Sequence, residues 1–269
     1  MNSAVPQQLM KPESGGGLLL LRRSTPLTRR HTIYFCSGAY TGSRLLALLE
    51  AGSYEGLGQT VERIRRIFDL GADPIQIASH LSRDPKLRQL VRRRPVLRVP
   101  GVWDGFEAAV LAVLGQKLTM PGSKRVVTRL VQVFGTPVNT PVRGLKYLFP
   151  RPEILVHADL SKAGISDSSA RVLRKLACST MRKHLTFSTL RTLERTVSQL
   201  AAVHGIDEST AHYIAMRAFG EPDAFPAKEP GLRRRLAELM PIASPVHAIH
   251  VAERWRPWRA YAAMHWRLS

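Results

Sequence analysis

Residues 200–231, LAAVHGIDESTAHYIAMRAFGEPDAFPAKEPG, are the stretch that decides the fold of this chain. The pattern predicts a helix over residues 188–200, a short turn around Gly205, a second helix over residues 208–219, and a loop punctuated by prolines. Because glycine permits a very tight turn between two helices, we expect a helical hairpin here. The loop then brings one carboxylate, Glu229, to the start of a further helix, since Pro230 suits a first helical turn.

The two ends of this stretch suggest different chemistry. The hairpin would expose backbone amides at the N-terminus of its second helix, where the helix dipole is positive. A phosphate group can bind there without any reading of base sequence. Glu229, at the start of the next helix, is expected to be ionised and to stabilise positive charge that develops nearby. Taken alone, an ordinary helical corner and a plain capping acid explain these features as simply.

The charge of the whole chain favours a polyanionic partner. Its 269 residues include 40 Lys and Arg against 20 Asp and Glu, which gives a formal net charge of +20. Nucleic acid is the expected partner, although an acidic membrane surface or ribosomal RNA would fit the charge as well. No apolar run approaches the roughly 20 residues that span a bilayer, so we expect no membrane-spanning segment and take nucleic acid, not a membrane, as the partner.

The two cysteines, Cys36 and Cys178, lie far apart and have no CxxC spacing. They support neither a disulfide framework, nor a zinc knuckle, nor a four-cysteine iron–sulfur cluster. The histidines show no spacing typical of metal ligands. We therefore expect a reducing, cytoplasmic setting and no required cofactor.

Almost every periodic segment is helical, which predicts a mainly α fold. In the first 41 residues only residues 32–36 have the character of a strand, and a single strand cannot make a sheet. The remainder of that region contains prolines, glycines and basic residues. The expected helices include residues 43–51, residues 59–70, a helix begun by Asp73 and Pro74, a helix capped by Asp104 and Glu107, and residues 123–134.

Three segments together resemble the DNA-3-methyladenine glycosylase II family, a branch of the helix-hairpin-helix DNA glycosylases. They are RVPGVWDGFEAAVLAVLGQKLT, HYIAMRAFGEPDAFPAKEPGLRRRL and the tail AERWRPWRAYAAMH, and the likeness covers residues 63–265 in order. It implies a two-lobed helical fold, with residues 56–103 plus 222–269 in the lobe that carries the acid and residues 104–221 in the lobe that carries the hairpin. Residues 1–55 would be a basic flexible arm or a shortened, poorly ordered remnant of the N-terminal β domain of the family.

The resemblance also implies an activity, in which duplex DNA is bent, an alkylated base is extruded and its N-glycosidic bond is cleaved. Glu229 would be the catalytic carboxylate, where the family has Asp. Tyr213 and Ser209 would line the base pocket, Ser209 in place of an aromatic residue. Trp266 or Arg267 would take the position of a pocket tryptophan. Bifunctional relatives have a lysine in place of Ser209, so the serine predicts a monofunctional enzyme.

The resemblance places the DNA contacts in two loops. Gln116 and Lys117 would lie at the minor groove, where family members insert a wedge into the duplex. Asp207 replaces a glycine, and its charge would oppose DNA. The residues that would grip phosphate are Val203, His204, Gly205, Ile206, Asp207 and Thr210. Hairpins of this kind often hold a Na⁺ or K⁺ ion, here through the carbonyls of Ala201, Val203 and Ile206.

The tail ERWRPWRAYAAMHW alternates aromatic and basic residues. Trp255, Trp258 and Tyr261 are expected to pack in the core, because large aromatic side chains dominate core energetics. The arginines between them are candidates for phosphate contact.

We therefore predict a monomeric, monofunctional DNA N-glycosylase that removes bases of the 3-methyladenine type from duplex DNA in base excision repair. It would act in the bacterial cytoplasm, in association with the nucleoid. The substitutions at Glu229, Asp207 and Ser209 support a second hypothesis, a catalytically inactive DNA-binding protein on the same fold. A third is a structural RNA-binding protein that uses its charge alone.

Overall fold

The computed structural model describes residues 18–25, 32–41, 44–50, 57–116, 120–138, 146–187, 192–240 and 244–269, the first three ranges as backbone only. Most of these residues are helical, which confirms the mainly α prediction. None of the described helices is both long and apolar enough to cross a membrane. The helices are α1 (Leu57–Ile67), α2 (Pro74–Leu81), α3 (Pro85–Arg93), α4 (Gly105–Gly115), α5 (Met120–Phe134), α6 (Pro152–His157), α7 (Asp167–Met181), α8 (Leu193–Ala201), α9 (Glu208–Ile214), α10 (Pro230–Leu239), α11 (Pro245–Ala252) and α12 (Arg259–Arg267). Shorter turns are the 3₁₀ segments η1 (Leu160–Ala163) and η3 (Glu253–Trp255) and the π-helical turn η2 (Ala215–Phe219).

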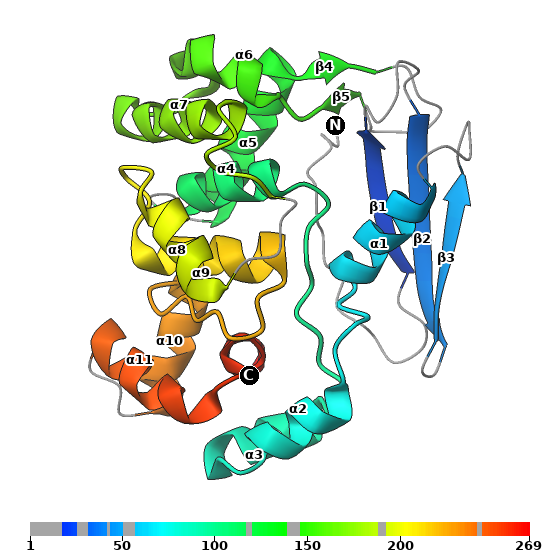
Figure 1. Cartoon of the computed structure of the whole chain (residues 1–269), viewed down its shortest axis with the longest axis vertical. Coiled ribbons are helices and arrows are strands. Elements are labelled where there is room, and N and C mark those ends of the chain that lie inside the picture. Colours follow the sequence, from blue (N-terminus) through cyan, green and yellow to red (C-terminus); the bar gives the residue numbers. More distant parts are fainter. Residues whose placement is uncertain are drawn as a thin grey trace.

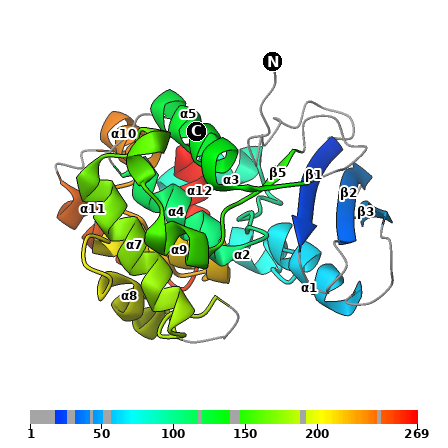
Figure 2. The same cartoon turned by 90° about the horizontal axis from the view of Figure 1, so that it is seen from above.

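Three strands near the start of the chain form an antiparallel sheet in the order β1-β2-β3. They are β1 (Leu18–Thr25), β2 (Thr32–Thr41) and β3 (Arg44–Glu50). The register pairs Thr25 with Thr32 and Thr41 with Arg44. Figures 1 and 2 show this sheet on one side of the helical body, opposite α7 and α11. A small ladder pairs β4 (Thr136–Pro137) with β5 (Tyr147–Leu148).

The sheet corrects two predictions for this region. The sequence predicts a single strand over residues 32–36, whereas three strands pair along their lengths. It predicts a helix over residues 43–51, whereas Arg44–Glu50 form β3. A short leucine-rich run has no periodicity that separates a helix from a strand, so pairing with β2 decides its conformation.

The helix starts follow the predicted caps. The side chain of Asp73 caps α2 and accepts hydrogen bonds from two amides of its first turn. The side chain of Asp104 caps α4 and accepts a bond of 2.9 Å from the amide of Glu107. Such side chains satisfy amides that have no acceptor within the helix, so these boundaries are encoded locally.

Two clusters of buried side chains hold the helices together. One cluster is built around α4, α5, α7 and α9, with Leu173 fully buried in it. The other is built around α3, α10 and α12, with Leu232 at 1% exposure. Tyr213 packs against both clusters, so it lies at their junction. The lobe boundaries at residues 103/104 and 221/222 stay a prediction.

Candidate functional site

Glu229 is the N-cap residue of α10 and lies next to the C-terminal end of α12. Its Oε2 accepts a hydrogen bond of 2.6 Å from the amide of Leu232. Its Oε1 lies 3.7 Å from Nε of Arg267. The Glu229 side chain is 18% exposed, so the acid is held in place and still reaches solvent.

The acid fits beside α10 because Gly231 has no side chain. A Cβ atom at this position would lie 3.2 and 3.3 Å from the two carboxylate oxygens of Glu229 and 3.5 Å from Nε of Arg267. The first two distances are tighter than ordinary van der Waals contact, so a larger residue would displace the carboxylate. Gly231 therefore helps to set the position of the acid.

The hairpin predicted around Gly205 is present, since α8 ends at Ala201 and α9 begins at Glu208. Gly205 has a φ angle of 103°, a backbone conformation that favours glycine. A Cβ atom there would also clash with Cγ2 of Val172 in α7. Glycine is thus required both by the turn and by its packing.

Four of the six predicted phosphate-binding residues of the hairpin form two groups. Val203 and Ile206 are 5% and 4% exposed and anchor the turn in the core. His204 and Gly205 face solvent. Their backbone amides donate no hydrogen bond to another residue in the described part of the chain. These two amides are therefore candidates for binding an anion. The Na⁺ or K⁺ ion on the carbonyls of Ala201, Val203 and Ile206 stays a prediction; the Val203 carbonyl already accepts a bond from the amide of Ile206.

Asp207 is the N-cap residue of α9 and connects the hairpin to two other segments. Its Oδ1 accepts a bond of 2.9 Å from the amide of Thr210 and lies 3.4 Å from Nε2 of Gln116. Its Oδ2 lies 3.2 Å from Nζ of Lys228. Burial disfavours the charged form of Asp207, but the hydrogen bonds from Thr210 and Lys228 outweigh it and lower the pKa of this carboxyl. The negative charge at the hairpin is therefore paired within the protein.

Ser209 joins the hairpin helix to the acid loop, which we define as residues 220–229. It is 9% exposed, and its Oγ accepts a bond of 2.8 Å from the backbone amide of Lys228. Lys228 directly precedes Glu229, so both the Ser209 and the Asp207 contacts act next to the acid. The sequence indicated neither contact. The place of Ser209 in a base pocket stays a prediction.

Gln116, at the end of α4, belongs to the same cluster of contacts. Its side chain is exposed, and its Nε2 donates a hydrogen bond to Oγ1 of Thr210. The end of α4, the hairpin and the acid loop therefore meet around Asp207. Lys117 lies outside the described residues.

A network of ion pairs anchors the acid loop to the tail. Arg259 is 4% exposed and binds Asp223 and Glu253, each at 2.9 Å. Arg256 binds the same two carboxylates. Burial of Arg259 among these carboxylates corrects the prediction that it contacts phosphate, whereas Arg256 is 45% exposed and its phosphate contact stays a prediction. The signal that could have predicted this is the pair of acids, Asp223 in the loop and Glu253 within the basic tail.

The tail carries the two candidates for a pocket residue. Trp266 is 2% exposed, and its ring centroid lies 6.2 Å from that of Trp255. The place of Trp266 in a pocket wall stays a prediction, and Arg267 is the tail residue that lies beside the acid. The core positions predicted for Trp255 and Tyr261 are confirmed by exposures of 1% and 4%.

Another arginine lies in the protein interior. The π-helical turn η2 carries Arg217, which is 5% exposed. Burial is the main cause that lowers the pKa of Arg217, and the positive charge of Arg267 contributes to the shift. π-Helical turns often occur at functional sites. Tyr213, one turn earlier, lies at the junction of the two clusters.

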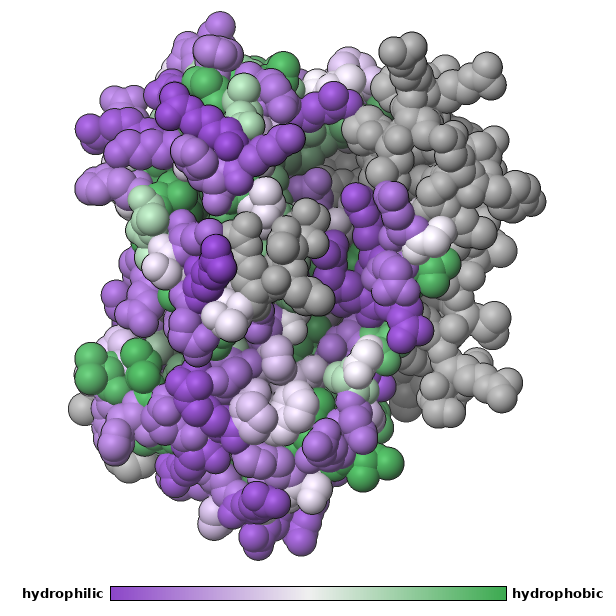
Figure 3. All heavy atoms as spheres, viewed as in Figure 1, coloured by the Kyte–Doolittle hydropathy of each residue, from purple (hydrophilic) through white to green (hydrophobic). Residues whose placement is uncertain are grey.

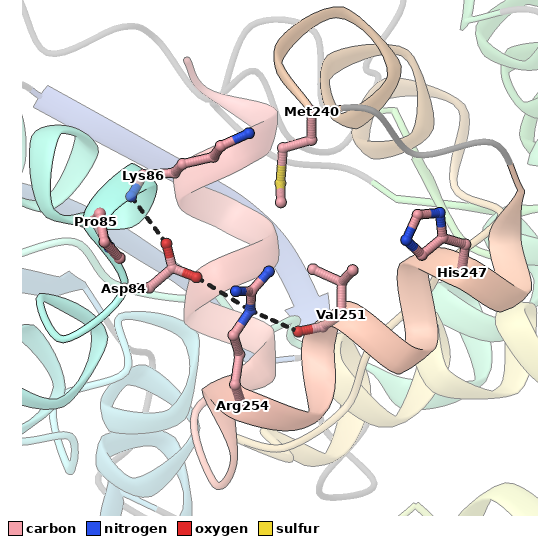
Figure 4. Close-up of a pocket in the computed structure, with 7 residues that line it drawn as sticks. All are labelled: Asp84, Pro85, Lys86, Met240, His247, Val251 and Arg254. Carbon is pink, nitrogen blue, oxygen red and sulfur yellow. Dashed lines mark hydrogen bonds and ion pairs between the residues drawn. The ribbon is translucent and has the colours of Figure 1, made fainter.

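A separate pocket of about 360 Å³ lies at the other end of α10 (Figure 4). Asp84 lines it but is already bonded to the amide of Lys86 and paired with Arg254. Met240 also lines it and follows Glu229 by about 16 Å along α10, at 1.5 Å per residue. This pocket is therefore distinct from the acid. On the face in Figure 3, hydrophilic residues cover most of the described surface. Among the described residues, no cluster of His, Cys, Asp and Glu side chains could hold a metal ion.

The tight hairpin, the acid at the following helix and the two helical clusters define the fold of the helix-hairpin-helix DNA glycosylases. The structure of a 3-methyladenine DNA glycosylase from Archaeoglobus fulgidus superposes with a TM-score of 0.75 and 22% identity, covering 93% of this chain and 86% of that one. Mag1, the 3-methyladenine DNA glycosylase of Schizosaccharomyces pombe, was solved in complex with abasic DNA. It superposes with a TM-score of 0.58 and 20% identity, covering 71% of this chain and 95% of its own.

More particularly, the chain belongs to the AlkA family, also called DNA-3-methyladenine glycosylase 2. It is 30% identical to DNA-3-methyladenine glycosylase 2 of Escherichia coli over 221 residues, which are 81% of this chain and 74% of that protein. It is 36% identical over 219 residues to the probable bifunctional transcriptional activator/DNA repair enzyme AlkA of Mycobacterium tuberculosis. The chain spans only 44% of that relative's length. Residues 19–104 match the AlkA N-terminal domain and include the three strands, which favours the second of the two alternatives predicted for residues 1–55, a remnant of the N-terminal β domain.

Proposed function

We propose that this chain is a monofunctional DNA N-glycosylase that removes alkylated bases of the 3-methyladenine type from duplex DNA in base excision repair. The observation that carries the proposal is the position of Glu229, a partly exposed carboxylate at a helix start, tied to the hairpin through the adjacent residue. The family supports the same activity, since the E. coli relative is named a DNA-3-methyladenine glycosylase.

In this proposal the hairpin holds the DNA backbone while the acid meets the sugar. A phosphate would bind the exposed amides of His204 and Gly205 without reading the bases. The bond between Ser209 and the amide of Lys228 then fixes the acid relative to the bound backbone. Extrusion of a base costs a few kcal/mol, least for a damaged base. Gln116 and Lys117 would lie where the duplex opens.

Glu229 would then act in two ways on the extruded nucleotide. Cleavage of the N-glycosidic bond leaves positive charge on the sugar, which a fixed carboxylate stabilises. The same carboxylate orients a water molecule and accepts its proton as the water oxygen bonds to C1′. Because the amide of Leu232 holds Oε2, the carboxylate has a fixed orientation before substrate arrives. The reaction needs no cofactor, so EDTA would leave base release unchanged.

We expect no lyase activity, because Ser209 stands where bifunctional relatives have a lysine that forms a Schiff base with the sugar. Lys228, which precedes the acid in the sequence, has its ammonium group bound to the carboxylate of Asp207. Treatment with borohydride during the reaction would therefore trap no covalent enzyme–DNA adduct. A trapped adduct that disappears in Lys228→Gln would show a bifunctional enzyme instead.

The test of the proposal is base release from methylated duplex DNA by the wild type, Glu229→Gln and Glu229→Asp. We expect the wild type to release 3-methyladenine and Glu229→Gln to lose at least about 100-fold in rate, as is typical when a group that stabilises transition-state charge is removed. Equal melting temperatures would show that both variants are folded. No base release by either the wild type or Glu229→Asp would refute the enzyme proposal.

The second candidate is a catalytically inactive DNA-binding protein, and the observation that favours it is the guanidinium of Arg267 beside the acid. An acid that is neutralised in this way loses part of its attraction for a cationic sugar. This candidate predicts salt-dependent duplex binding that Glu229→Ala leaves unchanged, with no base release. Fluorescence anisotropy over a series of salt concentrations measures that binding.

A further inference from the structure

The acid loop is bonded to the hairpin helix α9 at two points. His212 and Ser209 lie one turn apart on α9, so their side chains share a face of that helix. Ser209 accepts the bond of 2.8 Å from the amide of Lys228. Nδ1 of His212 accepts a bond of 3.3 Å from the amide of Phe225, four residues before Glu229.

The backbone amides of the acid loop show what these two side chains contribute. The amides of Ala227 and Glu229 donate to carbonyls of the loop itself. The amides of Phe225 and Lys228 donate to the side chains of α9. Bonds within the loop fix only its own shape, so the two bonds to α9 fix its position relative to the hairpin.

The acid loop and α9 pack in different clusters of buried side chains. Phe225 is 2% exposed, and its ring meets that of Trp255 edge-on, with 6.0 Å between the centroids, in the cluster around α3, α10 and α12. Ala211 and Ile214 of α9 are buried in the other cluster. The bond between Phe225 and His212 therefore joins the two clusters close to the acid.

His212 can accept this bond because its imidazole is uncharged at neutral pH. Burial is the main cause that lowers the pKa of His212, and the positive charges of Arg259 and Arg256 add to the shift. The carboxylates of Glu208 and Asp223 oppose these effects without cancelling them. Since Nδ1 is the acceptor, the proton of the neutral ring lies on Nε2.

We propose that His212 is a positioning residue that, together with Ser209, sets the place of the acid relative to the DNA backbone held at the hairpin. The inference rests on the proposed glycosylase function and assigns to His212 a role that acts through the backbone of the acid loop. If loss of the bond moves Glu229 by about half an ångström, base release slows about tenfold. Duplex affinity changes little, because the phosphate contacts of the hairpin remain.

The experiment measures single-turnover base release from methylated duplex DNA by the wild type, His212→Asn, His212→Gln and His212→Leu. The side-chain oxygen of asparagine can take the place of Nδ1, so His212→Asn should keep at least about half of the wild-type rate. Glutamine places its amide near the position of Nε2 and leucine offers no acceptor, so both variants should be slower by about tenfold. The affinity of all three for a duplex that carries tetrahydrofuran in place of one nucleotide should stay within about threefold of the wild type.

The matched control is His80→Leu. His80 is partly exposed like His212, lies on α2, and its side chain makes no hydrogen bond with another described residue. This variant should keep the wild-type rate. Equal rates in His212→Asn and His212→Leu, or an equal loss in His80→Leu, overturn the inference. If His212→Leu does not fold, His212→Asn and His212→Gln make the same comparison.

Hydrogen–deuterium exchange of the acid loop keeps this inference separate from the proposed function, because it requires no base release. Amides of residues 220–229 should exchange about fivefold faster in His212→Leu, whereas His212→Asn should keep the wild-type exchange. Unchanged exchange in His212→Leu overturns the inference even if the wild type releases bases. Faster exchange in a protein whose wild type releases no base would refute the glycosylase function and leave standing the role of His212 in holding the loop.

Discussion

Replacement of Gly231 by alanine should make the protein more stable and less active. Gly231 is the second residue of α10, where alanine favours the helix by up to about 1 kcal/mol. The added Cβ would lie 3.2 and 3.3 Å from the carboxylate oxygens of Glu229, and this contact relaxes if the carboxylate moves by a few tenths of an ångström. If 1 Å of misplacement costs about 100-fold in rate, a shift of about 0.3 Å costs roughly fourfold.

The assays are single-turnover base release from methylated duplex DNA and equilibrium unfolding in urea. The matched control is Gly58→Ala, because Gly58 is also the second residue of a helix, α1, and a Cβ there would meet no atom within 4 Å. The control should gain similar helix stability and keep its activity. Full activity in Gly231→Ala, or an equal loss in Gly58→Ala, would refute the link between Gly231 and the position of the acid.

Three further predictions concern the contacts around the acid loop and the core. Ser209→Ala leaves the amide of Lys228 without its acceptor, so the free energy of unfolding should fall by about 1–3 kcal/mol and base release should slow, as urea unfolding and single-turnover assays would measure. Asp207→Asn keeps a residue suited to capping α9 and removes the negative charge of an exposed ion pair, so the free energy of unfolding should change by less than about 1 kcal/mol. Fluorescence anisotropy should show tighter duplex binding at low salt, because this charge opposes DNA. Burial, with a contribution from the charge of Arg94, lowers the pKa of His265 from 6.5 to about 4. The unfolded chain therefore binds a proton that the folded protein does not between these pH values, and stability should fall by up to about 3 kcal/mol as pH drops from 6.5 to 4. Urea unfolding at several pH values measures this dependence. If His265→Gln leaves the change of unfolding free energy with pH unaltered, His265 is not its cause.

The elements that local chemistry specifies could be predicted from the sequence. The hairpin depends on Gly205, whose turn admits no side chain, and the start of α10 depends on Pro230 after Glu229. The caps at Asp73 and Asp104 likewise depend on short side chains that reach amides a few residues away. Each of these signals lies within one or two turns of the residue that produces it.

The features that depend on distant partners could not be predicted. β3 has the composition of a helix and becomes a strand because β2 pairs with it. The tail arginines Arg256 and Arg259 have the pattern of a phosphate-binding surface, yet their partners are the carboxylates of Asp223 and Glu253. The bond from Lys228 to Ser209 joins residues 19 positions apart on two different elements, and no periodicity reports such a contact.

The double attachment of residue 228 has a consequence for how this family can be recombined. The backbone amide of Lys228 is bonded to Ser209 and its ammonium group to Asp207. The hairpin and the acid loop are therefore structurally coupled. Grafting a relative's hairpin with glycine at position 207 would leave the ammonium of Lys228 without its carboxylate, one residue from Glu229. The two segments should therefore be exchanged together, and substitutions at positions 207 and 228 should show a coupling energy of up to about 1 kcal/mol in a double-mutant cycle.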